Sequence, residues 1–218
     1  AIIAGRILPF FAGVVMAGDK PKIRPGLEKW IWPATQITIV AFIASEFHNI
    51  ASYIAAGIFF IYGVLHAVRW YNWRPFASFK FPILVILFAG YFWLFIGFFF
   101  MPLYLSKVFA SLPTDAAYRS AAWHVFGIGA AGVFIFGMIT RVALGHTGRP
   151  IKASPSISFA YLTLNLALLA RVIIPLIGIT YANTGYLVAG SLWLITFVLY
   201  LVKYTPMLVR PRIDGRPG

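Results

Sequence analysis

The sequence predicts an all-α protein, a polytopic bundle of transmembrane helices, on three observations. Hydrophobic residues make up 61% of its 218 residues and charged residues only 11%, whereas a soluble domain is about 45–50% apolar and about 25% charged. Several windows run for about twenty residues without a charge, which is the length that crosses a bilayer. The basic residues are concentrated in alternate connections between these windows. The sequence therefore predicts a single transmembrane helical domain over residues 1–218.

The apolar windows define about six full spans in order along the chain. These are residues 33–48, 50–70, 82–105, 120–142, 156–177 and 182–203. The range 1–16 is apolar but too short to cross a bilayer, and Arg6 and Pro9 interrupt it. We expect this range to be the tail of a helix whose earlier part lies outside this sequence. An interfacial or re-entrant segment is the alternative.

The net charge of +13 indicates membrane topology rather than nucleic-acid binding. Fourteen Lys and Arg residues lie in the connections on one side of the predicted spans, and only Lys107 and Arg119 lie in those on the other side. Lys and Arg are retained on the cytoplasmic side during insertion, where they attract anionic lipids. We therefore expect a multi-pass protein of the bacterial inner membrane with a cytoplasmic carboxyl terminus. Its partners would include membrane lipids and no nucleic acid.

Ionisable side chains in the predicted spans are the candidate functional residues. A charge at the centre of a membrane helix costs about 2.5–3.5 kcal/mol, so such residues usually face the protein interior and serve a ligand. Those within the spans are His48, His66, His124 and Arg171, and those at the inner ends are Arg6, Arg141 and His146. For any one histidine the alternative is structural, a hydrogen bond to a neighbouring carbonyl group.

Helix geometry, at about 1.5 Å per residue, separates these residues into two layers. The outer layer contains His48, His124 and Arg171, and the inner layer contains His66, Arg6, Arg141 and His146. His66 and His124 would lie about 20 Å apart along the membrane normal, too far to be the two axial ligands of one haem. An imidazole beside a guanidinium suits the iron and a propionate of a haem, and neutral imidazoles equally suit copper. We therefore predict two sites, or two halves of one path.

Several other chemistries lack their sequence patterns here. The chain has no cysteine, so neither a disulfide framework nor a thiolate metal site is available. It has no His-Glu-x-x-His element. The carboxylate pair needed by a glycosidase or an aspartic protease is also missing from the predicted spans. Hydrolytic chemistry is therefore not expected.

The most distinctive segment is residues 140–150, where Arg141, His146 and Arg149 follow directly on an apolar, Gly-rich helix. No packing rule requires such a cluster, whereas a site for an anionic or metal-bearing ligand does. Further motifs are the Gly-Arg-x-x-Pro-x-Phe element at residues 5–11, His124 ahead of spaced glycines at 122–130, and Lys-Tyr-Thr-Pro at 203–206. With the Gly-His-Thr-Gly-Arg core at 145–149, these motifs resemble the NnrS family over nearly the whole chain.

The resemblance implies haem b and copper as cofactors and a role in nitric oxide metabolism, denitrification or tolerance of nitrosative stress. It places Arg6, Arg141, Arg149, His66, His124 and His146 among the residues expected to bind them. His48 matches none of the motifs, so its candidacy rests on its height in the bundle alone. Family members are about twice this length, and their amino-terminal half carries a Trp-His-x-His-Glu element. The resemblance covers only the carboxyl-terminal half, so the other half is an expected partner that supplies part of any metal site.

Three function classes follow from these observations, and whether the protein is an enzyme stays open. The first is an NnrS-like haem protein that meets nitric oxide, for which a Soret band should move when nitric oxide is added. The second is a b-type cytochrome membrane subunit for electron transfer, which a quinol should reduce reversibly. The third is a small-anion transporter, suggested by the buried Arg171, which would be colourless and move anions into liposomes.

Overall fold

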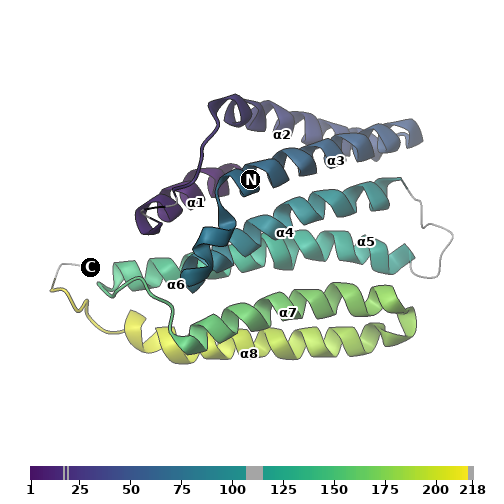
Figure 1. The fold of residues 1–218 in the computed structure, drawn as a ribbon. Helices are drawn as coiled ribbons and strands as arrows, with labels where there is room; N and C mark the ends of the chain where they lie inside the picture. The colour runs from purple at the N-terminus through teal and green to yellow at the C-terminus, as the bar shows by residue number, and fades with distance from the viewer. Residues whose placement is uncertain (17, 19, 107–114, 216–218) are drawn as a thin grey trace.

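The computed structural model describes residues 1–16, 18, 20–106 and 115–215, and all regular structure in these ranges is helical (Figure 1). The helices are α1 (Ile2–Val15), α2 (Pro25–Ser45), α3 (Asn49–Asn72), η1 (Pro75–Lys80), α4 (Pro82–Leu105), α5 (Asp115–His124), η2 (Val125–Val133), α6 (Phe134–His146), α7 (Pro155–Ile177), η3 (Ile179–Tyr181) and α8 (Ala182–Leu208). η1 and η3 are short 3₁₀-helices, whereas η2 is a π-helix. Because α5, η2 and α6 are continuous, they form one long helix with a π-helical middle.

Five helices in the described ranges are long and apolar enough to cross a membrane. They are Asn49–Asn72, Pro82–Leu105, Ala116–His146, Pro155–Ile177 and Ile179–Leu208. They match five of the predicted spans and confirm a polytopic helical bundle. The range expected to be a helix tail forms α1, a shorter apolar helix.

The remaining predicted span, 33–48, differs from the structure. It corresponds to α2, which begins at Pro25 and ends at Ser45, and which is not among the five long apolar helices of the described ranges. Its first turns carry Glu28 and Lys29, which lower its apolar character. The helix ends before His48 because that residue caps α3, its Nδ1 accepting a hydrogen bond from the Ile50 amide at 3.2 Å.

Prolines mark where several helices begin. Pro25, Pro82 and Pro155 occupy the first positions of α2, α4 and α7. The first turn of a helix leaves its amides without intrahelical partners, so the missing N–H of proline is tolerated there. This explains why the predicted starts of the spans at 82 and 156 agree so closely with the structure.

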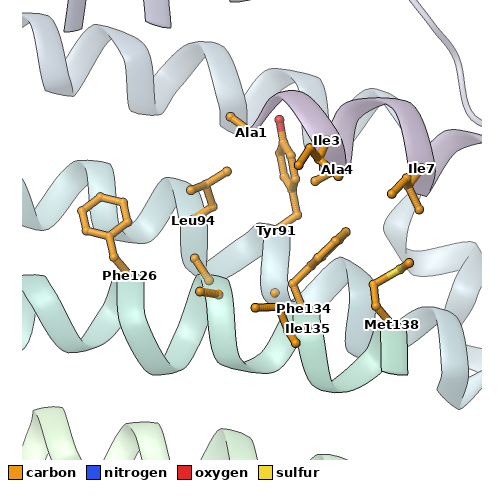
Figure 2. Close-up of a pocket in the computed structure, with 13 residues that line it drawn as sticks. Ala1, Ile3, Ala4, Ile7, Tyr91, Leu94, Phe126, Phe134, Ile135 and Met138 are labelled. Carbon is orange, nitrogen blue, oxygen red and sulfur yellow. The ribbon is translucent and has the colours of Figure 1, made fainter. Parts of the chain in front are cut away.

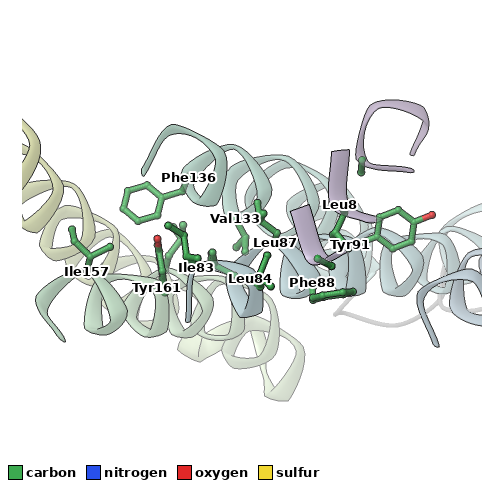
Figure 3. Packing of buried hydrophobic residues seen from close by; sticks show 14 of the residues in the cluster. Leu8, Ile83, Leu84, Leu87, Phe88, Tyr91, Val133, Phe136, Ile157 and Tyr161 are labelled. Carbon is green, nitrogen blue, oxygen red and sulfur yellow. The ribbon is translucent and has the colours of Figure 1, made fainter. Parts of the chain in front are cut away.

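α4 is the central helix, since it contacts α3 on one side and η2 and α6 on the other (Figure 1). The core around it, shown in Figure 3, contains Ile83, Leu84, Leu87, Phe88 and Tyr91 of α4 with Leu8, Val133, Phe136, Ile157 and Tyr161 of other helices. Gly90 allows α4 and α6 to approach closely, because a Cβ there would lie 2.7 Å from the Cβ of Phe134. Such close contact through small residues is typical of membrane helices.

The helix ends form two groups, because the long helices alternate in direction (Figure 1). The ends of α3, α6 and α8 lie at the same end of the bundle as the starts of α4 and α7. We call this the basic end. The start of α2 also lies there, and the described cations at or near this end are Lys20, Lys22, Arg24, Lys29, Arg69, Arg74, Lys80, Arg141, Arg149, Lys152, Lys203, Arg210 and Arg212. Lys107 and Arg216, which also entered the charge comparison, lie outside the described residues.

Candidate functional site

A buried polar network surrounds Arg69 of α3, which was counted among the fourteen basic residues of the connections and lies at the end of the predicted span 50–70. The residue is 3% exposed. Its Nε donates a hydrogen bond to Glu28 Oε1 of α2 at 2.7 Å, and its Nη2 donates to Oε2 of the same carboxylate. Its Nη1 donates to the Tyr91 hydroxyl of α4 at 3.0 Å and to the carbonyl oxygen of Ala1 at 3.3 Å. One guanidinium therefore joins α2, α3, α4 and the residue that precedes α1.

His66 lies in the same network, one turn before Arg69 on α3 and fully buried. Its Nδ1 is 2.5 Å from the Tyr91 hydroxyl. Its Nε2 is buried and has no hydrogen-bond partner in the described structure. The ring of Tyr62 packs edge-on against the imidazole at 4.5 Å between centroids, and that of Phe98 lies at 5.4 Å. A buried polar atom without a partner is costly and requires an explanation.

This arrangement is chemically suited to ligand binding at one ring nitrogen. Metal-bound histidines usually have their other ring nitrogen held by a hydrogen bond, which fixes the tautomer and the ring orientation. His66 Nδ1 shares such a hydrogen bond with the Tyr91 hydroxyl, and Arg69 donates to the same hydroxyl. In the tautomer whose Nδ1–H donates to the Tyr91 oxygen, Nε2 carries the lone pair that could bind a ligand.

An apolar groove of about 400 Å³ lies beside the network, between α1, α4 and the η2–α6 segment (Figure 2). Small residues and larger apolar ones line it, among them Ala4, Gly90, Ala130, Leu94, Phe134 and Met138. The Tyr91 ring forms part of its wall, whereas the Tyr91 hydroxyl belongs to the network. His66 does not line the groove. Tyr91 therefore separates the free imidazole nitrogen from the apolar space.

Arg141 of α6 lies beyond one end of this groove. It follows the lining residue Met138 by one turn, and its guanidinium carbon is 3.3 Å from the centroid of the Phe11 ring. Phe11 in turn follows the lining residue Ile7 by one turn of α1. The Nε of Arg141 is buried and has no hydrogen-bond partner in the described structure. A cation with a buried N–H that lacks a hydrogen bond therefore lies one turn beyond the groove, where α6 contacts α1 through Phe11.

The other predicted members of the inner layer are not enclosed with His66. Arg6 and His146 are both exposed, on α1 and at the end of α6. The backbone oxygen of His146 accepts a hydrogen bond from Arg212 Nη1 at 3.1 Å. The structure instead places His66 in one network with Tyr91, to which it bonds directly, and with Arg69 and Glu28, and none of the three was a predicted site residue.

The predicted outer residues have separate partners. His124 is half-buried, and its Nδ1 donates to the carbonyl oxygen of Ser120 at 2.7 Å. This hydrogen bond to a neighbouring carbonyl group is the structural alternative given above for each histidine. It occupies only Nδ1, so Nε2 of His124 remains available to a ligand. The guanidinium of Arg171 lies over the Tyr186 ring at 3.9 Å, with Nη1 buried and unpartnered in the described structure. His48 is exposed and caps α3.

The histidines do not gather into a metal cluster. Among the described residues, no three His, Cys, Asp or Glu side chains are placed to hold a metal ion together. His48, His66, His124 and His146 each belong to a different part of the fold. A metal bound by one of these imidazoles therefore needs further ligands of another kind, and the four nitrogens of a haem macrocycle are such a set.

The segment at 140–150 forms the end of α6 and the turn that follows it. The Arg149 amide donates to the Leu144 carbonyl at 2.9 Å and the Gly148 amide to that of Gly145 at 3.2 Å, which is the Schellman pattern of a helix end. Gly148 has the positive φ of 71° that this pattern requires. The carboxyl-terminal tail packs against the turn, with the Ile213 amide donating to the Thr147 carbonyl at 3.3 Å.

In the comparison with protein-family models, residues 1–212 match the NnrS protein family. The chain belongs to the NnrS family. The comparisons with curated proteins and with solved structures found no match. The resemblance noted in the sequence is therefore confirmed at the level of the family.

For this NnrS chain, sequence reasoning found the buried histidine and missed its partners. His66 stood out because it is an ionisable residue within an apolar span. Arg69 was available as a signal, because it lies three positions after His66 and thus on the same helix face. Glu28 and Tyr91 gave no such signal, since they join this network only through the packing of α2 and α4 on α3.

Proposed function

We propose that this NnrS-family membrane protein binds haem b and acts in nitric oxide metabolism or in tolerance of nitrosative stress. The observation that carries the proposal is the buried Nε2 of His66, which has no partner in the described structure although its ring is held by Tyr91. Within a membrane domain, an ionisable group kept in this state is usually functional. Family membership supports the same role.

The residues present fit a haem in their chemistry. His66 would supply the imidazole, with Tyr91 and Arg69 holding its orientation. The groove between α1, α4 and α6 has apolar walls that suit the faces of a macrocycle, and because the Tyr91 ring stands between this groove and the imidazole, coordination would require that ring to move. Arg141 would supply a cation for a propionate. A bound haem would provide an iron that takes nitric oxide as a ligand. The protein would hold the ring, exclude water from it and neutralise its carboxylates.

Copper is proposed as the second metal, at the outer part of the bundle. The hydrogen bond from His124 Nδ1 to the Ser120 carbonyl leaves Nε2 as the coordinating nitrogen. Because no three-residue cluster surrounds it in the described ranges, this site would draw its other ligands from elsewhere. An amino-terminal half of the kind found in longer family members is the proposed source.

The proposed location is the bacterial inner membrane, with the basic end and the carboxyl terminus in the cytoplasm. This orientation is supported by the cations at the basic end, because Lys and Arg in short connections are retained on the cytoplasmic side. Nitric oxide is small and apolar enough to reach the spans through the lipid, so the orientation places no limit on its access.

The experiment is an absorption spectrum of the full-length protein purified in detergent, with haem and metal analysis. We expect a Soret band that moves on addition of nitric oxide and is lost or shifted in His66→Ala. His48→Ala is the matched control, since His48 is exposed and caps α3, and its spectrum should be unchanged. An unaltered spectrum in His66→Ala would contradict the proposal. A colourless protein that transports anions would favour the small-anion transporter. Rapid reduction of the pigment by a quinol would favour the b-type cytochrome membrane subunit.

A further inference from the structure

The basic end holds a second pocket, distinct from the proposed haem site. Its volume is about 370 Å³, and the end of α6, the turn after it, the start of α7 and the end of α8 surround it. Two of the sequence motifs meet in this pocket. Arg149 and Pro150 come from the segment at 140–150, and Lys203 and Tyr204 come from the Lys-Tyr-Thr-Pro element at 203–206. The proposed function uses neither Lys203 nor Tyr204.

The polar side of this pocket is cationic. Arg149, Lys152 and Lys203 line it, and no Asp or Glu is among the lining residues. Arg149 donates to the backbone oxygen of Thr147 at 3.3 Å, and in the described part of the chain no carboxylate pairs with any of the three cations. Ser154 and Pro155, at the amino-terminal end of α7, add the positive end of a 23-residue helix. The pocket therefore suits an anionic group.

The other side of the pocket is apolar. Leu144, Ile157 and Met207 line it, and the ring of Tyr204 is almost completely buried beside them. These residues belong to the ends of helices that are long and apolar enough to span a membrane. The pocket therefore lies where candidate membrane spans begin and end, with a cationic side and an apolar side.

We propose that this pocket binds the phosphate headgroup of an anionic membrane lipid. Arg149, Lys152 and Lys203 contact the phosphate, and the glycerol and first acyl carbons lie against Leu144, Ile157 and Met207. Basic pockets between transmembrane helices at the cytoplasmic side are suited to such headgroups. A soluble phosphate compound shares the anionic chemistry but leaves the apolar side uncovered. The lipid is the occupant that matches both sides, and the assignment does not depend on the haem proposal.

The test is titration of the purified full-length protein in detergent at 0.1 M NaCl with phosphatidylglycerol, with phosphatidylcholine of the same chain length as the neutral control. Native mass spectrometry counts the bound lipid. We expect tight binding of phosphatidylglycerol only. The double variant Lys152→Gln with Lys203→Gln should weaken this binding by about 30-fold. Each basic residue near the surface contributes about 1 kcal/mol to lipid binding, and about 1.4 kcal/mol corresponds to a tenfold change in affinity.

The matched control is Lys22→Gln with Lys80→Gln, which removes the same charge from exposed residues in two other connections of the basic end. It should change the affinity by less than about threefold, because neither residue lines the pocket and salt weakens the interaction of exposed charges with a group that they do not contact. Equal losses in the two double variants would overturn the proposal, because they would indicate a diffuse attraction. Equal affinity for phosphatidylcholine would overturn it as well.

Excess inorganic phosphate distinguishes the two sources of the anionic group. We expect it to leave phosphatidylglycerol bound. Displacement of the lipid by inorganic phosphate from the unaltered protein would overturn the assignment to a lipid in favour of a soluble phosphate ligand. Unfolding midpoints without lipid verify that each variant is folded, and pigment content should be unchanged. Should the double variant fail to fold, Lys152→Gln alone tests the exposed cation, with an expected loss of about fivefold.

Discussion

At the scale of single residues, Arg69 and Glu28 form a buried ion pair that connects α3 to α2. The Arg69 side chain is 4% exposed and that of Glu28 is 27% exposed. Removing two charges from water is costly, so the pair as a whole stabilises the fold less than its geometry suggests. Removing one partner has a larger effect, because the remaining charge keeps its desolvation cost and loses its compensation.

We expect Arg69→Leu to lower the free energy of unfolding by about 3 kcal/mol, since Glu28 loses its cation and Tyr91 loses a donor. Adding Glu28→Gln to that variant should recover about 1 kcal/mol or more. The measurement is unfolding of the purified protein in mixed micelles with increasing denaturing detergent. Arg24→Leu, at an exposed position, should stay within about 0.5 kcal/mol of the unaltered protein. A similar loss in both single variants would contradict the role assigned to the pair.

The same residues show what a single sequence leaves hidden at the site. His66 is recognisable because its position within an apolar span makes it costly without a function or partner. Arg69 and Glu28 look like topology charges, since each lies near the end of a hydrophobic window. Their pairing spans 41 positions and depends on how α2 packs on α3. No periodicity within either helix encodes that contact.

At the scale of elements, the end of α6 is determined by Gly148. The Schellman turn requires a left-handed residue there, and a Cβ on Gly148 would lie 2.6 Å from the carboxyl carbon of Asp214. Asp214 also accepts hydrogen bonds from Arg212, whose Nη1 bonds the last residue of α6. One glycine therefore permits both the helix end and the docking of the tail against it.

We expect Gly148→Ala to lower the free energy of unfolding by about 1–2 kcal/mol, the cost of a left-handed conformation for a residue with a Cβ. The clash with Asp214 should also release the tail, which limited proteolysis after residue 208 would detect. Gly57→Ala is the control, because a Cβ there meets nothing within 4 Å and alanine favours the helix by about 1 kcal/mol. Unchanged stability and an equally protected tail in Gly148→Ala would contradict this account.

The elements were more predictable than the site, for a physical reason. A span needs only a long apolar window, and prolines such as Pro82 and Pro155 fix where a helix starts. α2 begins at Pro25, before its predicted range of 33–48. Its first turns are polar, so a search for apolar windows does not recognise them as part of the helix. The π-helix Val125–Val133 was not predicted from the sequence. Within it, a Cβ on Gly129 would lie 2.7 Å from the Leu168 side chain and 2.8 Å from that of Trp93, a packing that the sequence alone does not reveal.

At the scale of the whole molecule, charge is distributed unevenly between the two ends of the bundle. The described cations gather where α3, α6 and α8 end and α4 and α7 begin. This one asymmetry underlies the proposed orientation, and it also supplies the cations of the lipid pocket. A protein inserted in the opposite orientation would place that pocket at the outer leaflet. The anionic lipids that give the cytoplasmic leaflet its negative surface potential would then lie on the other side of the membrane.

The orientation can be tested cleanly because the chain contains no cysteine. Single cysteines at Phe47 and Tyr181, both exposed at the end opposite the basic end, should react with a membrane-impermeant maleimide in intact bacterial cells. Single cysteines at Lys80 and Lys152, both exposed at the basic end, should react only after the inner membrane is permeabilised. The reverse pattern would invert the proposed orientation. Reaction of only one member of either pair would instead contradict the grouping of helix ends on which both the topology and the lipid pocket depend.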